Sequence, residues 1–555
     1  MNDLNTPLST TTIAAAEDVL GVRYTETERA FMLDNLAGQI ALAQRRREIR
    51  LPHDLAPATR FDPRLPGFVM PVPASPKSNE GDTQSLPIPN DAASICFAPV
   101  TQLSAWIRHR HISAERLAGL YLDRIARFGP TLECIATATS DLAMTQARRA
   151  DALLAAGTYL GPLHGIPWGC KDLLDSSGVV TGWGAEPFAE RVPATDATVV
   201  QRLTAAGAVL VAKLTLGALA YGDVWYGGVT RNPWNRNEGS SGSSAGSGSA
   251  TAAGLVAFSL GTETLGSIVA PSLRCGTTGL RPTFGRVPRT GAMPLCWTLD
   301  KIGPMCRSVA DTALVLAAIN GGDPADSCSI DAPFAFDAAA SVAGLRLGYY
   351  PADFAEAGVN DLDRAMLDHA SALGLTLVEL SRPTLPYDSL MNVLFAEAAA
   401  SFEHLTLDDT DDSLTWQEPG SWPNTFRKAR FLSAVDHIQL DRLRRRVMQD
   451  MDRAFEGVDA MIGPCLAGPM LIITNFTGHP SLVLRCGFRQ STTRKPLSLA
   501  EARLDQGQDS TGATFTVPHA ISLYGRLFDE STILRIGLAL ETRLDVAHHR
   551  PPLEA

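Results

Sequence analysis

The stretch EGSSGSSAGSGSAT, residues 238–251, stands shortly before the apolar run LVAFSLGTETLGSIVAP, residues 255–271. Runs of glycine and serine usually form flexible linkers. Small residues also occur where the backbone must pass close to a buried group or a ligand. Because composition leaves both interpretations open, the spacing of reactive residues around the stretch has to decide between them.

The composition of the whole chain is that of an ordinary globular protein. It has 555 residues, of which 45% are hydrophobic and 19% charged, and these values argue against disordered and fibrous classes. The formal net charge of −11 would repel a phosphate backbone. The two dense basic runs, RRR at 45–47 and RLRRR at 442–446, fall in helix-like segments and are interpreted as solvated faces. We therefore expect no nucleic-acid partner.

The nine cysteines and the N-terminus bear on the compartment. The cysteines lie between Cys96 and Cys486 without a CxxC pair or a His/Cys ligand spacing, so we expect buried thiols and no metal site. The N-terminus lacks the basic and apolar regions of a signal peptide, and no apolar run reaches the ~18 residues of a membrane span. These features predict a cytoplasmic protein that does not associate with membranes.

Hydrophobic periodicity predicts an α/β chain with an N-terminal extension. A helix is expected over 25–49, where Thr25 and Glu28 have the spacing of a capping box. Residues 51–93 carry nine prolines and predict a linker or an extended arm. Further helices and strands then alternate in βαβ order, with Lys171 near the end of one strand. Residues 408–413 and 489–512 are expected to be surface segments.

Three sets of residues compete as the reactive centre. The sequence GSSAG at 242–246 matches GxSxG and would make Ser244 a nucleophile, but no strand precedes it as that motif requires. Cys170 beside Lys171 could form a thiol-based site, although a cysteine in an apolar context is usually inert. The third set combines Lys171 with Ser243 and Ser267.

The third set lies in a series of motifs that resembles the amidase signature family. The chain has GPLHGIPWGCKDLLD at 161–175, RNPWN at 231–235, and GSSAGS at 242–247 followed by GTETLGSIVAPSLRCGTTGLRPTFGRV at 261–287. FTGHPSLVLRCGF at 476–488 and ISLYGRLFDESTILRIG at 521–537 are similar to the closing blocks of the family. The resemblance covers roughly residues 95–320 and 455–545. It implies a single large α/β/α sandwich with a central mixed, twisted sheet, plus the N-terminal helical extension.

The resemblance assigns the catalytic roles. It makes Ser267 the nucleophile, Ser243 a bridging serine preceded by a cis peptide bond, and Lys171 the base. Ser243 precedes Ser267 by 24 residues and follows Lys171 by 72, spacings close to those of the family. A linker has no need of such spacings, so the glycine and serine run is interpreted as part of the active site.

Lysine can serve as the base only if it is neutral. Its reference pKa of about 10.4 would have to fall by roughly three units, and burial can lower it in this way. By analogy with the family, the backbone N–H groups of Thr264, Leu265, Gly266 and Ser267 form the oxyanion hole. Leu265 replaces a glycine of the family, so a positive φ at that position would be strained.

The same analogy places Gly242 and the aromatic residues Tyr221, Trp225 and Tyr226 near the substrate, with aromatic core packing as the alternative for these three. Glu263 stands where the family usually has aspartate, Val269 replaces an arginine, and Arg274 takes a commonly apolar position.

The resulting prediction is an amidase that cleaves a carboxamide C–N bond through an acyl-enzyme on Ser267, without metal or organic cofactor. The expected partner is a small aryl or alkyl amide, with a carbamate or an ester as further options, and the expected state is a monomer or homodimer. Two alternatives stay open: a glutaminase-type subunit of a tRNA-dependent amidotransferase, and a catalytically silent binding scaffold.

The expected organisation has five segments. They are a helical extension at 1–50, a proline-rich linker or arm at 51–93, a first core part with the catalytic residues at 94–320, a variable substrate-pocket region at 321–455, and the closing core part at 456–555.

Overall fold

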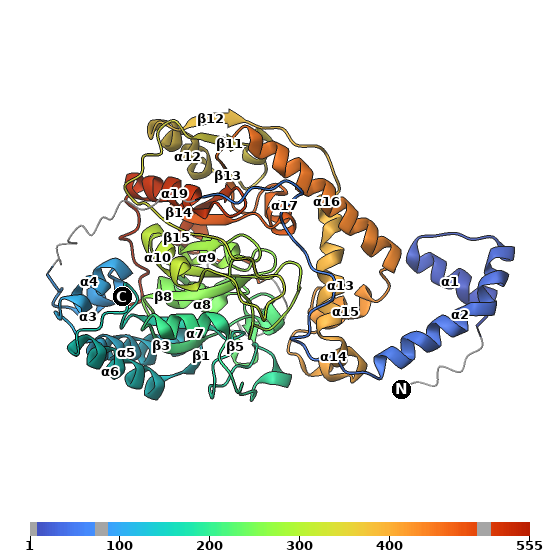
Figure 1. Ribbon diagram of the computed structural model, residues 1–555, viewed down its shortest axis with the longest axis horizontal. Helices are drawn as coiled ribbons and strands as arrows, with labels where there is room; N and C mark the ends of the chain where they lie inside the picture. The colour runs from blue at the N-terminus through green and yellow to red at the C-terminus, as the bar shows by residue number, and fades with distance from the viewer. Residues whose placement is uncertain (1–7, 73–86, 497–511, 555) are drawn as a thin grey trace.

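The computed structural model describes residues 8–72, 87–496 and 512–554. Its centre is a mixed sheet of 11 strands in the order β1-β3-β2-β8-β10-β9-β14-β15-β13-β11-β12 (Figure 1). The strands are β1 (Ile135–Ala138), β2 (Pro167–Lys171), β3 (Val209–Leu214), β8 (Phe258–Glu263), β9 (Thr278–Arg281), β10 (Lys301–Cys306), β11 (Arg346–Tyr349), β12 (Thr376–Glu379), β13 (Ala460–Pro464), β14 (Ser481–Thr492) and β15 (Thr514–Gly525). Two short ribbons, β4 (Val224–Trp225) with β5 (Gly228–Val229) and β6 (Arg231–Asn232) with β7 (Asn235–Gly239), lie outside it. The expected α/β sandwich is therefore confirmed.

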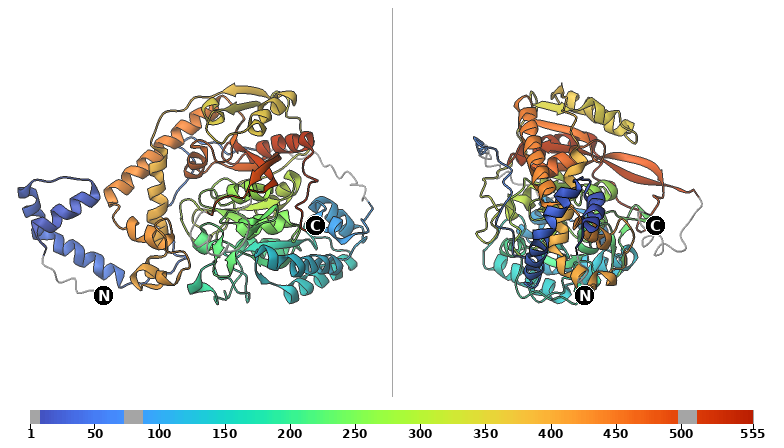
Figure 2. Two further views of the ribbon diagram at one scale, coloured as in Figure 1. Left: turned by 180° about the vertical axis from the view of Figure 1, so that it is seen from behind. Right: turned by 90° about the vertical axis from the view of Figure 1, so that its right-hand side faces the viewer.

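Helices cover both faces of this sheet (Figures 1 and 2). Successive residues of a strand point to opposite faces, and β14 shows the consequence. Leu482 packs against Gly537 of α19, whereas Val483 clusters with Val269 of α9 on the other side. The helices of the core are α3 (Ala92–Phe97), α4 (Val100–Arg108), α5 (Ala114–Leu132), α6 (Ser140–Ala155), α7 (Thr198–Ala205), α8 (Ala245–Ala252), α9 (Val269–Cys275), α10 (Val309–Ile319), α11 (Pro351–Phe354), α12 (Asp361–Ala372), α13 (Met391–Ser401), α14 (Glu403–Leu407), α15 (Trp422–Ala429), α16 (Ala434–Glu456), α17 (Met470–Thr477) and α19 (Glu530–Leu544).

The strands that position the site are fully buried. β2 pairs in parallel with β3 on one side and with β8 on the other. The chain passes from β2 to β3 through α7, which is the expected βαβ order. Since every residue of β2, β3 and β8 is buried, a polar side chain at the end of one of them must find its partners inside the protein.

The N-terminal extension forms a helical hairpin and an extended strap. Helix α1 (Thr10–Leu20) and helix α2 (Glu26–Arg47) stand away from the sheet at one end of the molecule (Figures 1 and 2). Thr25 and Glu28 form the predicted capping box of α2. Residues 48–72 then run in extended form along the core, as the proline content indicated. Residues 73–86 of the predicted arm lie outside the described residues.

The interpretation of the basic run at 442–446 as a solvated face is wrong for one residue. Arg444 is 1% exposed, and its guanidinium donates to the carbonyl of Phe476 and to the carbonyl and hydroxyl of Thr298. It also lies over the ring of Phe61 in the strap. A helical repeat brings one residue of such a run to the core side, and this one is satisfied there by hydrogen bonds.

Two of the expected surface segments differ in detail from the structure. Asp411, in the acidic stretch 408–413, is 1% exposed, while its neighbour Asp412 is exposed. Of residues 489–512, the first four belong to β14 and pair with β15, and residues 497–511 lie outside the described residues. All nine cysteines are buried and free, as predicted. Among the described helices, none is long and apolar enough to cross a membrane.

Candidate active site

Lys171 ends β2 and is completely buried. Its Nζ lies within hydrogen-bond distance of three hydroxyl oxygens, at 2.8 Å from Ser243 Oγ, 2.8 Å from Thr262 Oγ1 and 3.0 Å from Ser244 Oγ. No carboxylate of the described residues lies within ion-pair distance of this nitrogen. The lysine is thus surrounded by hydroxyl groups in place of a counter-ion.

This environment favours the neutral amine. Burial lowers the pKa of Lys171 well below its ordinary value, and the more distant carboxylates of Asp300 and Glu263 offset only part of that effect. A neutral amine has a lone pair and can accept a proton. Lys171 therefore has the electrostatic setting that a base requires.

The glycine and serine run passes directly over this lysine. All residues from Ser243 to Ala252 are buried, so the run is a packed wall and no linker. The Gly242–Ser243 peptide bond is cis, as the resemblance implied. A Cβ atom at Gly242 would lie 1.8 Å from the carbonyl oxygen of Gly222, which is why only glycine fits next to Ser243 here.

Ser267 lies in the tight turn between β8 and α9, and 8% of it is exposed. Its carbonyl accepts a hydrogen bond from Ser244 N at 3.1 Å, which joins this turn to the glycine and serine run. No hydrogen bond between Ser267 Oγ and Ser243 Oγ is present among the described residues. The structure therefore brings Lys171 and Ser243 into contact and attaches the Ser267 turn to them through the backbone.

The turn has one residue with positive φ, and it is Gly266 at 84°. Leu265 keeps an ordinary negative φ and packs against the main core. The strain expected for a leucine at this position therefore does not arise. Within the described part of the chain, none of the N–H groups of residues 264–267 donates to a protein acceptor, and their role as an oxyanion hole stays a prediction.

Glu263 fixes the other side of this turn. Its carboxylate accepts from Ile268 N at 2.9 Å and Val269 N at 3.0 Å, and it pairs with the buried Arg281 at 2.7 Å. Burial alone would raise the pKa of this carboxyl, but Arg281 and the N–H donors bring it to about 2. The glutamate noted as a departure from the family thus holds the backbone directly after Ser267. Sequence reasoning gave Glu263 no such role, although its position next to the motif was a signal.

The competing centres do not assemble. Ser244 Oγ accepts from Thr262 N and donates to Thr262 O, each at 3.0 Å, so its proton is already used. Burial raises the pKa of Cys170 to about 11, and its thiol points to backbone carbonyls. His164, seven residues before Lys171, has its Nε2 2.9 Å from the carbonyl oxygen of Ala150. Ser244 and Thr262 instead hold Lys171, a role that the sequence analysis missed.

The predicted aromatic residues occupy two places. Tyr221 is 41% exposed and stacks on Trp416, with ring centroids 4.8 Å apart. Trp225 and Tyr226 contact each other edge to face at 4.9 Å. Arg274, the other departure, faces Glu238 at 3.5 Å.

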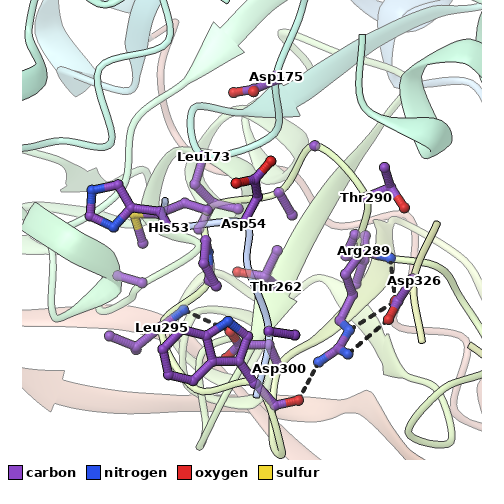
Figure 3. Close-up of a pocket in the computed structure, with 18 of the residues that line it drawn as sticks. His53, Asp54, Leu173, Asp175, Thr262, Arg289, Thr290, Leu295, Asp300 and Asp326 are labelled. Carbon is purple, nitrogen blue, oxygen red and sulfur yellow. Dashed lines mark hydrogen bonds and ion pairs between the residues drawn. The ribbon is translucent and has the colours of Figure 1, made fainter. Parts of the chain in front are cut away.

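A cavity of about 790 Å³ adjoins this cluster (Figure 3). Thr262, the partner of Lys171, and Thr264, of the predicted oxyanion turn, lie in its wall. Its lining contains none of Tyr221, Trp225 and Tyr226, and none of Lys171, Ser243 and Ser267, so the place of the three aromatic residues near the substrate stays a prediction. Charged groups face it instead, among them Asp54 from the strap, Arg289 and Asp300.

Comparison with known proteins identifies the family. The family model described as Amidase matches residues 116–534. The chain belongs to the amidase signature family. It is thus an enzyme of the class that acts on amide C–N bonds, and the family resemblance drawn from the motifs is confirmed.

Two kinds of protein among the matches differ in what their names say. The first is the A-type subunit of glutamyl-tRNA(Gln) amidotransferase. The chain is 32% identical to that of Moorella thermoacetica, over 81% of this chain and 98% of that protein, and 34% identical to that of a Roseiflexus species, over 80% and 95%. The second group is found among solved structures, where the peptide amidase from Stenotrophomonas maltophilia matches with a TM-score of 0.69 and 27% identity, over 82% of this chain and 98% of that one.

These relatives correct the expected partners. The expectation that a small-molecule amide is the only partner of a monomer or homodimer, with no nucleic acid involved, is wrong, because the relatives are named as one subunit of an enzyme that acts on glutamyl-tRNA. The negative net charge does not exclude a nucleic-acid partner, because net charge governs only non-specific attraction to phosphate. A negatively charged subunit can belong to an assembly whose nucleic-acid contacts lie elsewhere.

Proposed function

We propose that the chain hydrolyses a carboxamide by attack of Ser267 Oγ on the carbonyl carbon, with Ser243 as proton relay and Lys171 as base. The observation that carries this proposal is the fully buried Lys171, which has hydroxyl partners, no paired carboxylate among the described residues, and a 2.8 Å contact with Ser243 Oγ. A serine hydroxyl needs a base during attack, and no described histidine takes that place.

In the proposed first half-reaction, Ser267 Oγ bonds to the carbonyl carbon and releases its proton to Ser243, whose own proton passes to Lys171. The N–H groups of the 264–267 turn stabilise the negative oxygen of the tetrahedral intermediate. The proton then returns through Ser243 to the amide nitrogen, the C–N bond breaks, and ammonia or an amine leaves. A water molecule repeats the sequence on the acyl-enzyme and releases the acid.

Two contacts support the relay role of Ser243. Thr262 Oγ1 and Ser244 Oγ take two donor directions of Lys171 and orient its nitrogen toward Ser243. A hydroxyl can donate and accept at once, so Ser243 can pass one proton on while receiving another.

The key test is covalent labelling of Ser267. A fluorophosphonate should label the parent protein and fail to label Ser267→Ala, and hydrolysis of any accepted amide should be lost with it. Labelling at another residue, or undiminished hydrolysis by Ser267→Ala, would refute the assignment. The test also decides between a hydrolase and the catalytically silent scaffold. A strained Leu265 in the oxyanion turn would favour the scaffold, but Leu265 does not have a positive φ.

For the substrate, the named relatives favour the glutaminase-type subunit over an independent amidase of small aryl or alkyl amides. We propose that the amide is that of glutamine and that the ammonia is delivered within a larger assembly. Affinity purification from the native cells should then recover a stable hetero-complex, and glutamine should be its best substrate among a panel of amides. A chain recovered alone and inactive on glutamine would contradict this.

A second candidate function is the hydrolysis of peptide amides, and it rests on the structural neighbours. The peptide amidase aligns with this chain over 98% of its own length. The extension at residues 8–72 precedes the residues that the family model matches. Hydrolysis of peptide amides in preference to glutamine would favour this candidate.

We also propose the five-segment organisation, a mechanism without a cofactor and a cytoplasmic location, as the sequence analysis expects them.

A further inference from the structure

The strap of the N-terminal extension forms one wall of the cavity beside the proposed catalytic cluster. Five consecutive residues, Pro52–Ala56, line it together with Thr262 and Thr264 of the core. These five precede the family model by some 60 residues, since the model begins at 116. The cavity is thus bounded by residues that are specific to this chain's extension.

The strap is anchored at this place by contacts on both sides of the cavity segment. Before it, Arg46 forms a two-pronged pair with Glu403 at 2.6 and 2.7 Å. Within it, His53 Nδ1 lies 2.8 Å from the carbonyl oxygen of Ser401, and its ring packs against Trp183 at 5.6 Å. After it, Arg60 donates to the carbonyl of Ser327 at 2.9 Å. These contacts fix the backbone of 52–56 against the core.

More carboxylates than basic side chains face the cavity. The lining holds the carboxylates of Asp54, Asp175, Asp196, Asp300 and Asp326 against the bases Arg191, Arg289 and Lys301. Arg191 is paired with Asp175 at 2.7 Å and Arg289 with Asp326 at 3.1 Å. Asp300 is held by Thr264 Oγ1 and by two backbone N–H groups.

Asp54 differs from these paired groups. Among the described residues, its carboxylate has neither a hydrogen bond nor an ion pair, and Figure 3 labels it among the residues of the lining. A carboxylate in a cavity whose arginines are already paired favours a cation as its next neighbour.

We propose that segment Pro52–Ala56 is a specificity element of the active site, and that Asp54 selects acyl groups that carry an ammonium group remote from the scissile bond. This inference rests on the proposed function, because it takes the cavity as the acyl-group side of Ser267. Asp54 acts on binding only and takes no part in proton transfer.

The test compares two activated esters that differ only in one charge, 4-nitrophenyl 6-aminohexanoate and 4-nitrophenyl hexanoate. The readout is the ratio of their kcat/KM values, measured on the full-length protein. Because Asp54 is exposed to solvent, the parent protein should favour the ammonium ester by about two- to fivefold. Asp54→Asn should bring the ratio close to one, and Asp54→Lys should invert it.

Two controls make the outcome specific. Asp18→Asn changes an exposed carboxylate of the same extension, 68% exposed on α1 and remote from the cavity, and should leave the ratio unchanged. Raising the salt concentration to about 0.5 M should reduce the preference of the parent protein, because screening weakens an exposed pair. A structural effect of the substitution would alter both esters alike.

A ratio that stays the same in Asp54→Asn and Asp54→Lys would overturn the proposal, as would a parent protein without preference. Failure of the proposed function looks different: ester hydrolysis would then persist in Ser267→Ala, or be absent from the parent protein altogether.

Discussion

The buried pair of Glu263 and Arg281 gives the most quantitative prediction. Both side chains are 0% exposed and 2.7 Å apart. Glu263→Gln keeps the shape of the side chain and leaves the guanidinium without its charged partner. Removing one member of a buried pair typically costs about 3–5 kcal/mol.

The lowered pKa of Glu263 gives an independent value for the loss in free energy of unfolding. The pKa of Glu263 is about 2 in the folded protein against an ordinary 4.5, and about 1.36 kcal/mol per unit converts this difference to about 3 kcal/mol at neutral pH. With an unfolding entropy of about 2.1 cal/mol/K per residue, a cooperative unit of the whole chain would lose about 3 °C in Tm. A smaller unfolding unit would shift by more.

The assay is thermal unfolding of the parent protein and Glu263→Gln between pH 5 and 8, with Glu26→Gln as an exposed control. The folded pKa of Glu263 is depressed, so its contribution is complete above the unfolded pKa near 4.5 and declines only as pH falls toward 2. The Tm difference should therefore be constant from pH 5 to 8. A Tm equal to that of the control, or a difference that varies across this range, would refute the reasoning.

Three further predictions concern the site and the strap. Lys171→Ala should abolish amide hydrolysis at every pH, and in the parent protein kcat/KM should rise with pH through the lowered pKa of Lys171; a variant with only a shifted pH optimum would contradict the base role. Gly242→Ala should lose activity or fail to fold, because the new Cβ meets the carbonyl of Gly222, whereas Gly38→Ala in α2 has open space and should be neutral or slightly stabilising by urea denaturation. The ring of His404 packs against His53 of the strap, with centroids 4.7 Å apart. Burial lowers the pKa of His404 to about 4, so its contribution to strap packing is present above pH 6.5 and lost as pH falls through 4. Limited proteolysis should cut residues 48–72 faster at pH 4 than at pH 7, and equal rates would argue against this role.

The sequence was sufficient for the fold because much of that information is local, whereas the roles of the three proposed catalytic residues come from the family resemblance and stay a prediction. The buried strand ending in Lys171, the small residues around Ser243 and the turn before Ser267 each have a pattern that one short stretch carries. The spacing of 24 and 72 residues then separated Ser243 from its serine neighbours, and the structure places that serine 2.8 Å from the lysine.

Pairings between distant segments could not be predicted in this way. Glu263 meets Arg281 and Asn475, 18 and 212 residues away, and nothing in its own surroundings names those partners. The same limit made Arg444 look like part of a solvated face. Periodicity alone does not show which residue of a basic run turns inward, because that depends on the segments packed against the helix.

The strap is the extreme case of this limit. Its proline-rich sequence excludes regular structure without saying which surface it follows, and its contacts at Ser401 and Ser327 lie more than 250 residues further along the chain. Local sequence could therefore support a linker as well as an arm. Once the strap is placed, its residues 52–56 become part of the cavity beside Lys171, so substitutions in the extension should change substrate preference while leaving the proton path from Ser267 to Lys171 in place.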